Sequence, residues 1–342
     1  MTLIYFVLIL GLIIFIHEFG HFIMAKKHGV YCYEFSLGMG PKLYSFNRKN
    51  DETLYVLRLF PIGGYVQMAG EEIEDDKDIP KNKKMQSKSI WQRLSIVVAG
   101  VCNNFILGIL LLFLLGIVYG CPETKPLVKD TSYNAAKVGI KSGDIIKKIN
   151  NKKMKSIDDA LLEFQLVKEG ESINVVVERD KKVQNAVTII PVKDKDTDKY
   201  VYGISLSNEV HKGFLTSVKY SFTKFASIYR NMFKVIGSLI TGRLGINSLS
   251  GPVGIYNVIG EQRKAGFQNV IYLAAYISIN VGFVNLIPFP AFDGGRALFL
   301  IIEKIRKKPI DQKVENTIHT IGFALLMLLI VVITINDIIK LF

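Results

Sequence analysis

Cysteine is scarce in this chain, and its three cysteines, Cys32, Cys102 and Cys121, are odd in number and far apart. No two of them form a CxxC pair, so the sequence indicates neither a disulfide framework nor a zinc knuckle. We therefore expect all three to be packing residues.

A basic block interleaved with aromatic residues is also absent, although 43 lysines and arginines outnumber 30 acidic residues. The net charge of +13 is spread along the hydrophilic stretches, which favours solvation and anionic lipid headgroups over nucleic acid as the partner. No internal repeat or low-complexity segment is visible. The N-terminus lacks a basic region and a small-residue cleavage site, so the first apolar stretch is expected to be a retained membrane span.

Apolar residues are abundant, at 49% of the chain with a mean hydropathy of +0.28, which is typical of a membrane protein with sizeable polar parts. A fifth long candidate helix, Phe214 to Ile240, carries several lysines and an arginine, so we expect it to be amphipathic and to lie along the membrane or beside the bundle. The stretches long and apolar enough to cross the membrane as helices are about 3–25, 94–119, 267–289 and 318–339.

Basic residues suggest how these spans are oriented. Lys26 and Lys27 follow the first span, and the predicted short loop 299–317 is rich in lysine and arginine. The positive-inside rule places both segments in the cytoplasm, which puts the N-terminus and residues 120–266 outside. The expected location is the inner (cytoplasmic) membrane.

Between the first two spans, Thr53 to Leu59 alternates as a strand, Pro61, Gly63 and Gly64 predict a turn, and Tyr65 to Met68 returns as a second strand. The sequence therefore predicts a hairpin here. After the second span the pattern changes to a soluble α+β unit, with predicted helices at 134–138 and 157–167 and predicted strands at 144–149, 173–178 and 186–191.

The sequence His17-Glu18-Phe19-Gly20-His21 is an HExxH motif inside the first apolar span. On a helix, positions i and i+4 share one face, so both imidazoles can reach one metal ion, and Glu18 lies close enough to activate water. A chance match is the alternative reading of so short a motif. However, two histidines and a glutamate inside a membrane span are costly unless they face a metal or a polar partner. We therefore predict a zinc site with Glu18 as the catalytic base.

A catalytic zinc ion takes three protein ligands, so one more is needed. The candidate is Asp293, which follows the proline-containing stretch 285–292 and precedes Gly294 and Gly295. Proline and glycine can bend the backbone and direct a carboxylate into the bundle. From the residues alone, a plain turn aspartate at the membrane boundary is the favoured alternative.

The order of these motifs resembles the site-2 protease family of intramembrane zinc metalloproteases, in the bacterial branch that cleaves anti-sigma factors and remnant signal peptides. The resemblance covers most of the chain, including the soluble unit after the second span. At residues 100–105 the chain departs from the family pattern, which more often has a proline there. The motifs that carry the resemblance are 17–21, 35–41, 60–66, 250–255 and 285–295.

The resemblance implies that His17, His21 and Asp293 are zinc ligands, that Glu18 is the general base, and that Asn285 positions substrate or steadies the oxyanion. An amide in a span can also simply hydrogen-bond a neighbouring helix, so Asn285 has a structural alternative. The hairpin at 60–68 would be a membrane-reentrant element that offers its edge to an unwound substrate, with Gly63, Gly64 and Tyr65 as substrate-binding residues. The soluble unit would be one PDZ domain.

The expected protein is thus a polytopic α-helical membrane protein with about four transmembrane helices, a membrane-reentrant β-hairpin and an inserted α+β PDZ domain. Its partners would be transmembrane substrates trimmed beforehand by another protease, and membrane lipid. The main alternative is a non-catalytic membrane scaffold that presents the PDZ domain. The expected divisions are 1–121 for the first two spans with the hairpin, 122–207 for the PDZ domain, 208–266 for the amphipathic region and 267–342 for the last two spans.

Overall fold

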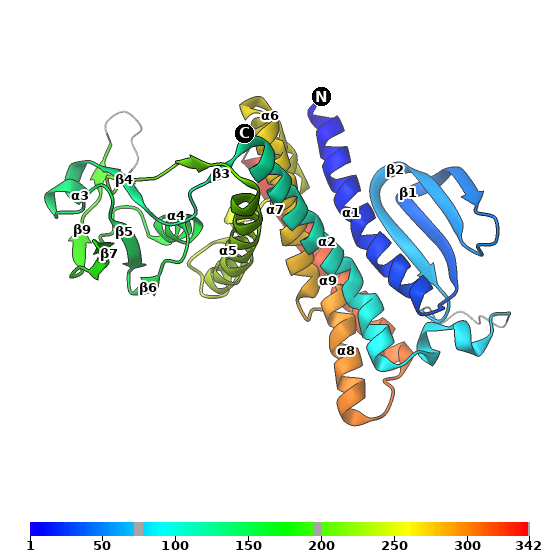
Figure 1. Cartoon of the computed structure of the whole chain (residues 1–342). Coiled ribbons are helices and arrows are strands. Elements are labelled where there is room, and N and C mark those ends of the chain that lie inside the picture. The colour runs from blue at the N-terminus through cyan, green and yellow to red at the C-terminus, as the bar shows by residue number, and fades with distance from the viewer. Residues whose placement is uncertain (72–77, 195–199, 341–342) are drawn as a thin grey trace. The chain divides into compact units, whose positions relative to one another are not determined.

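The computed structural model describes residues 1–71, 78–194 and 200–340. It divides into two compact units, one formed by Met1–Leu111 with Leu249–Phe342 and the other by Leu112–Ser248 (Figure 1). The first unit contains the HExxH motif, and the second contains the predicted soluble unit.

Four helices among the described residues are long and apolar enough to cross a membrane, as predicted. The third ends at Leu286 and not near Phe289, because Pro288 and Pro290 follow and proline cannot continue a helix. The chain is therefore a multi-pass membrane protein. The four helices are α1 (Thr2–Lys27), α2 (Ile90–Tyr119), α7 (Phe267–Leu286) and α9 (Gln312–Ile339).

Two shorter helices complete the first unit, α6 (Pro252–Ala265) and α8 (Asp293–Arg306). The prediction of a loop from 299 to 317 is wrong in part, because α8 continues to Arg306 and ends at the left-handed residue Lys307. Inside the bundle, the buried carboxylate of Asp337 on α9 accepts hydrogen bonds of 2.8 Å from the amides of Gly251 and Gly254 at the start of α6. A carboxylate at a helix N-terminus satisfies amides that otherwise lack partners.

The residues between α1 and α2 form two long strands, β1 (Cys32–Asn47) and β2 (Leu54–Met68). The predicted pairing of 53–59 directly with 65–68 is wrong, because residues 35–37 lie between the two segments, although 55–57 and 64–66 run in opposite directions and the chain therefore reverses between them within β2. The motif stretch 35–41, which was not predicted as a strand, supplies the missing partner. Its residues 35–37 pair on one side with 55–57 and on the other with 64–66, so residues 64–68 keep one edge without a partner among the described strands.

The second unit has a core of a small sheet in the order β6-β5-β7-β8, with β9 paired to β7. The predicted helices correspond to α3 (Tyr133–Lys137) and α4 (Ile157–Leu166). Predicted strands 144–149, 173–178 and 186–191 correspond to β5 (Ile145–Ile149), β7 (Ile173–Arg179) and β9 (Val187–Ile189). The remaining strands are β3 (Cys121–Pro122), β4 (Val128–Thr131), β6 (Lys152–Lys153), β8 (Lys182–Val183), β10 (Val192–Lys193), β11 (Tyr200–Val201), β12 (Ile204–Leu206) and β13 (Val210–His211).

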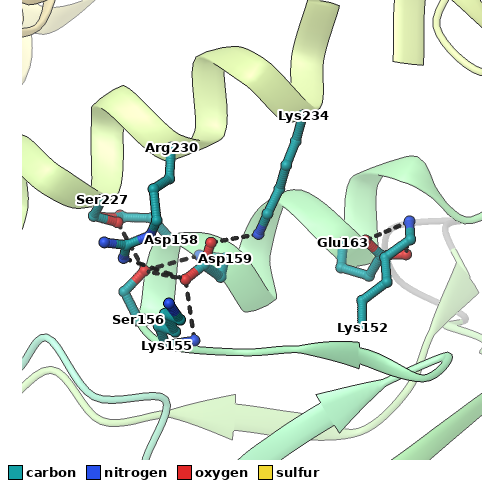
Figure 2. Close-up of polar contacts among 9 residues, drawn as sticks. All are labelled: Lys152, Lys155, Ser156, Asp158, Asp159, Glu163, Ser227, Arg230 and Lys234. Atoms are coloured by element: carbon teal, nitrogen blue, oxygen red, sulfur yellow. Dashed lines mark hydrogen bonds and ion pairs between the residues drawn. The ribbon is translucent and has the colours of Figure 1, made fainter. Parts of the chain in front are cut away.

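Helix α5 (Phe214–Ile240) belongs to the second unit, and its polar side meets α4. Figure 2 shows the side chains of the two helices facing each other. Lys224 Nζ donates to Asp158 at 2.6 Å, the hydroxyls of Ser156 and Ser227 lie 2.7 Å apart, and Lys234 pairs with Asp159. Large apolar side chains of α5 remain exposed, so the helix is amphipathic as predicted: Phe214, Leu215, Phe222, Phe233 and Ile240.

Candidate metal centre

The two histidines of the HExxH motif lie one turn apart on α1, and both are buried. Their Nε2 atoms are 3.3 Å apart, and the planes of the two rings are close to perpendicular at 83°. The i, i+4 spacing therefore brings two imidazole nitrogens to one point inside a candidate membrane span.

Asp293 completes this cluster from a segment far away in the sequence. It is the first residue of α8, and its Oδ2 atom lies 3.1 Å from His17 Nε2 and 3.4 Å from His21 Nε2. The loop just before Asp293 turns sharply, because Ala291 adopts a positive φ of 88°. The bent loop after α7 thus delivers the carboxylate to the two histidines.

These spacings fit a zinc ion. Zinc bonds of about 2.0–2.1 Å to nitrogen or oxygen, at tetrahedral angles, place neighbouring ligand atoms about 3.3 Å apart. The three measured separations, 3.1, 3.3 and 3.4 Å, match that value. Three protein ligands leave one of four positions open, as catalytic zinc sites do.

Contacts behind the histidines favour the tautomer that binds metal through Nε2, in which Nδ1 carries the proton. His21 Nδ1 lies 2.8 Å from the carbonyl oxygen of Ile96, so it donates to that oxygen. His17 Nδ1 lies 3.3 Å from the side-chain amide of Asn104, a fully buried residue. The atom of Asn104 that faces His17 is Nδ2, and its Oδ1 has no partner among the described residues. Turning the amide over exchanges the two atoms, and His17 Nδ1 then donates to Asn104 Oδ1.

Helix α2 approaches these rings closely because residue 100 is glycine. A Cβ atom at Gly100 would lie 2.8 Å from Cε1 of both His17 and His21, closer than real Cβ contacts allow. Any larger residue would therefore push α2 away from the metal ligands. Residues 100–105, where the chain departs from the family pattern, lie well inside α2 and not at its start.

A cavity of about 440 Å³ surrounds the three ligands. Glu18 and Tyr65 line it together with them, so the structure brings the predicted base and one predicted substrate-binding residue to the cluster. Gly64 lies against Glu18, because a Cβ there would be 3.3 Å from Glu18 Cγ. Other lining residues include Met68, Glu71, Arg296, His319 and Thr320.

Three predicted site residues do not line this cavity: Asn285, Gly63 and Gly64, although Gly64 contacts Glu18. Asn285 is half-buried in the last turn of α7, and Gly63 lies beside Met39 with a φ of 95°. Sequence reasoning in turn missed Gly100, Asn104 and His319. The motif 100–105 offered a signal for the first two, whereas His319 stands in an otherwise apolar helix without any recognisable pattern.

Comparisons with known proteins agree with this geometry. Residues 5–329 match peptidase family M50. The zinc metalloprotease RasP of Bacillus licheniformis is 35% identical in an alignment that covers 100% of this chain and 99% of that protein. The regulator of sigma-W protease RasP of Bacillus subtilis is 34% identical with the same coverage, and the zinc metalloprotease RasP of Shouchella clausii is 32% identical, again with 100% and 99% coverage.

Among solved structures, the PDZ domain of an SdrC-like protein from Listeria monocytogenes matches 26% of this chain and 90% of that structure at 20% identity. Its TM-score of 0.20 is too low to support any statement about the fold. The family match and the full-length relatives do not depend on it. The chain belongs to peptidase family M50, the site-2 protease family of intramembrane zinc metalloproteases.

Proposed function

We propose that His17, His21 and Asp293 hold the zinc ion of this metalloprotease and that Glu18 is its general base, acting on peptide bonds within transmembrane segments. The observation that supports this most directly is the convergence of three ligand atoms on a helix apolar enough to span a membrane. The separations of 3.1 to 3.4 Å suit a single ion.

When bound, zinc would lower the pKa of water to about 7 and polarise the scissile carbonyl. Glu18 shares the cavity with the ligand set, so its carboxylate can accept a proton from the attacking water and later give it to the leaving amine. Asn104 and Ile96 hold the two imidazoles in position from behind.

The free edge of β2 would receive the substrate. A transmembrane helix has its backbone groups already hydrogen-bonded, so it must unwind before water can attack. Pairing with residues 64–68 would hold the unwound segment as an added strand next to Glu18, which Gly64 contacts. In this proposal β1 and β2 form the membrane-reentrant element, with Tyr65 as a substrate contact. The assignments of Asn285 and Gly63 remain predictions.

The name of the relative from Bacillus subtilis, regulator of sigma-W protease, supports membrane-bound anti-sigma factors as one substrate class; remnant signal peptides are the other that the resemblance suggests. We further propose that residues 122–207 are a PDZ domain on the extracytoplasmic side, which admits substrates already trimmed by another protease. The metal would lie nearer the cytoplasmic face, since His17 and His21 precede the basic pair Lys26 and Lys27. On this proposal the protein resides in the inner (cytoplasmic) membrane.

The test compares full-length wild-type protein with the variant Glu18→Gln in detergent, using a labelled single-span peptide that carries helix-weakening residues. We expect cleavage by the wild type and a loss of at least about 100-fold in the variant, with zinc content unchanged, because general-base catalysis contributes roughly 10² to 10⁴. We also expect a lower zinc content in each of three purified ligand variants, His17→Ala, His21→Ala and Asp293→Ala.

Near-normal turnover by Glu18→Gln would remove its role as base. Full zinc retention by Asp293→Ala would remove that residue from the ligand set. A wild-type protein that holds zinc and binds the peptide but never cuts it would favour the non-catalytic scaffold.

A further inference from the structure

His319 on α9 has a defined tautomer, although no motif marks it. The backbone N–H of Ala291 donates to His319 Nδ1 at 3.1 Å. An amide N–H can only donate, so Nδ1 is the acceptor and the ring carries its proton on Nε2. The side chain therefore presents one hydrogen-bond donor, Nε2–H, on the side of the ring away from Ala291.

The position of His319 is set by close packing of α9 on the loop that delivers Asp293. Gly322, one turn along α9, lies directly against Pro290, and a Cβ there would be 2.5 Å from the Pro290 carbonyl oxygen. The ring of Phe299 on α8 lies 5.5 Å from the imidazole, centroid to centroid. Helix, loop and ring thus hold the imidazole in one place.

The Nε2 atom of His319 is buried and has no hydrogen-bond partner in the described part of the chain. An unpaired buried donor is costly, so an acceptor on a bound substrate would stabilise the complex at this position. His319 lines the cavity that contains His17, Glu18 and Asp293. It also lines an adjoining cavity of about 640 Å³ between β2 and α9, where the strand contributes residues 65–68.

We propose that His319 is a substrate-binding residue whose Nε2–H donates a hydrogen bond to a main-chain carbonyl of the extended substrate. This inference rests on the proposed function. A segment paired with the edge of β2 satisfies only the backbone groups that face the strand, because the groups of an extended chain alternate in direction. The carbonyls on its other side need donors, and the cavity between β2 and α9 offers His319 for one of them.

Two substitutions at His319 distinguish the role of Nδ1 from the role of Nε2. In His319→Asn the side-chain oxygen can take the place of Nδ1 and still accept from Ala291, but no donor reaches the position of Nε2. In His319→Gln an amide donor can reach that position. Thr317→Ala is the matched control on the same helix. Among the described residues the Thr317 side chain bonds only to the carbonyl of Lys313, and it does not line either cavity.

The measurement is the affinity of full-length protein for a fluorescent single-span peptide in detergent, with Glu18→Gln as the background of every variant so that no cleavage occurs. Adding His319→Asn should weaken binding about tenfold, the effect of one neutral hydrogen bond, while His319→Gln stays within about threefold of the parent. Thr317→Ala should bind like the parent, and zinc content should be equal in all.

Binding by the His319→Asn protein as tight as that of its parent would overturn the proposal. Loss of zinc or a lowered unfolding temperature in both His319 variants would also overturn it, because His319 would then only support the loop. Failure of the proposed function would give a different result, because wild-type protein would then bind the peptide without cutting it.

Discussion

At the scale of single residues, the proposed metal centre has partners that do not themselves bind the metal. Asn104 is fully buried, its side-chain amide lies 3.3 Å from His17 Nδ1, and its amide oxygen accepts a hydrogen bond only when the amide is turned so that His17 donates to it. Such a contact selects the ring tautomer and raises the affinity of the site for metal. Its neighbour Asn103 instead donates to the backbone carbonyl of Ile16, which is not an imidazole contact.

We therefore predict that Asn104→Leu lowers zinc affinity by about 10- to 100-fold, the usual effect of losing a partner behind a metal-bound histidine. Asn104→Asp, which keeps an acceptor, should retain most of the affinity. Zinc titration against a competing chelator measures this, with Asn103→Leu as the control on the same helix. Wild-type zinc affinity in Asn104→Leu would show that His17 needs no partner at Nδ1.

At the scale of elements, the second unit holds α5 against α4 mainly through charge. Asp159 is 1% exposed, accepts from Ser156, and pairs with Lys234 (Figure 2). Burial opposes ionisation of this carboxyl, but the hydrogen bonds from Lys234 and Ser156 outweigh burial and hold the pKa of Asp159 below its ordinary value of 3.8. The two helices are thus joined by an ionised group inside their contact.

The sign of the pH dependence follows from this shift. A carboxyl with a lower pKa in the folded state stabilises the fold above its ordinary pKa, and the stabilisation is lost as the pH falls through the folded value. We predict that Asp159→Asn destabilises the second unit by about 2 kcal/mol at pH 7 and reduces the loss of stability below about pH 4.

Thermal unfolding of the full-length protein, followed by circular dichroism at pH 7 and at about pH 3.5, checks this prediction. Lys152→Met is the matched control, because Lys152 pairs with Glu163 in the same unit without touching α5. Equal acid sensitivity in the wild type and Asp159→Asn would mean that the α4–α5 contact does not depend on this charge.

At the scale of the whole molecule, residues 112–248 form a compact unit whose folded domain is inserted between two paired strands. Strand β3 enters and β13 leaves side by side, with Cys121 opposite His211 and Pro122 opposite Val210. A deletion between these strands can therefore be closed by a short linker without stretching the chain. This arrangement is what a domain inserted at one point of the chain requires.

We predict that deleting residues 124–207 and joining the ends with a short Gly/Ser linker leaves zinc bound and still permits cleavage of a short single-span peptide. Discrimination between trimmed and full-length substrates should weaken, because the inserted domain no longer excludes bulky ectodomains. Cleavage of both substrates in liposomes by intact and deleted enzyme measures this. Loss of short-peptide cleavage with zinc and folding preserved would mean that the domain helps to build the active conformation.

Local pattern was enough for much of this protein. The length of each apolar stretch determines that it can span a membrane, and the four predicted spans are all present as helices. Spacing along one helix places His17 and His21 together, because i and i+4 share a face whatever surrounds the helix. Apolar patterns likewise located β5, β7 and β9, and the alternation is clear in β7, which buries Ile173, Val175 and Val177.

Only the tertiary structure decided which distant segments meet. Asp293 was one candidate among ordinary turn residues until the loop after α7 was seen to bring it within 3.1 Å of His17. The hairpin prediction paired two segments of β2 with each other, whereas residues 35–37 of β1 lie between them, and the local pattern of neither strand specifies this pairing. Gly100, Asn104 and His319 matter only through contacts made by other helices. Packing sums many weak interactions between residues far apart in the chain, and no local spacing encodes that sum.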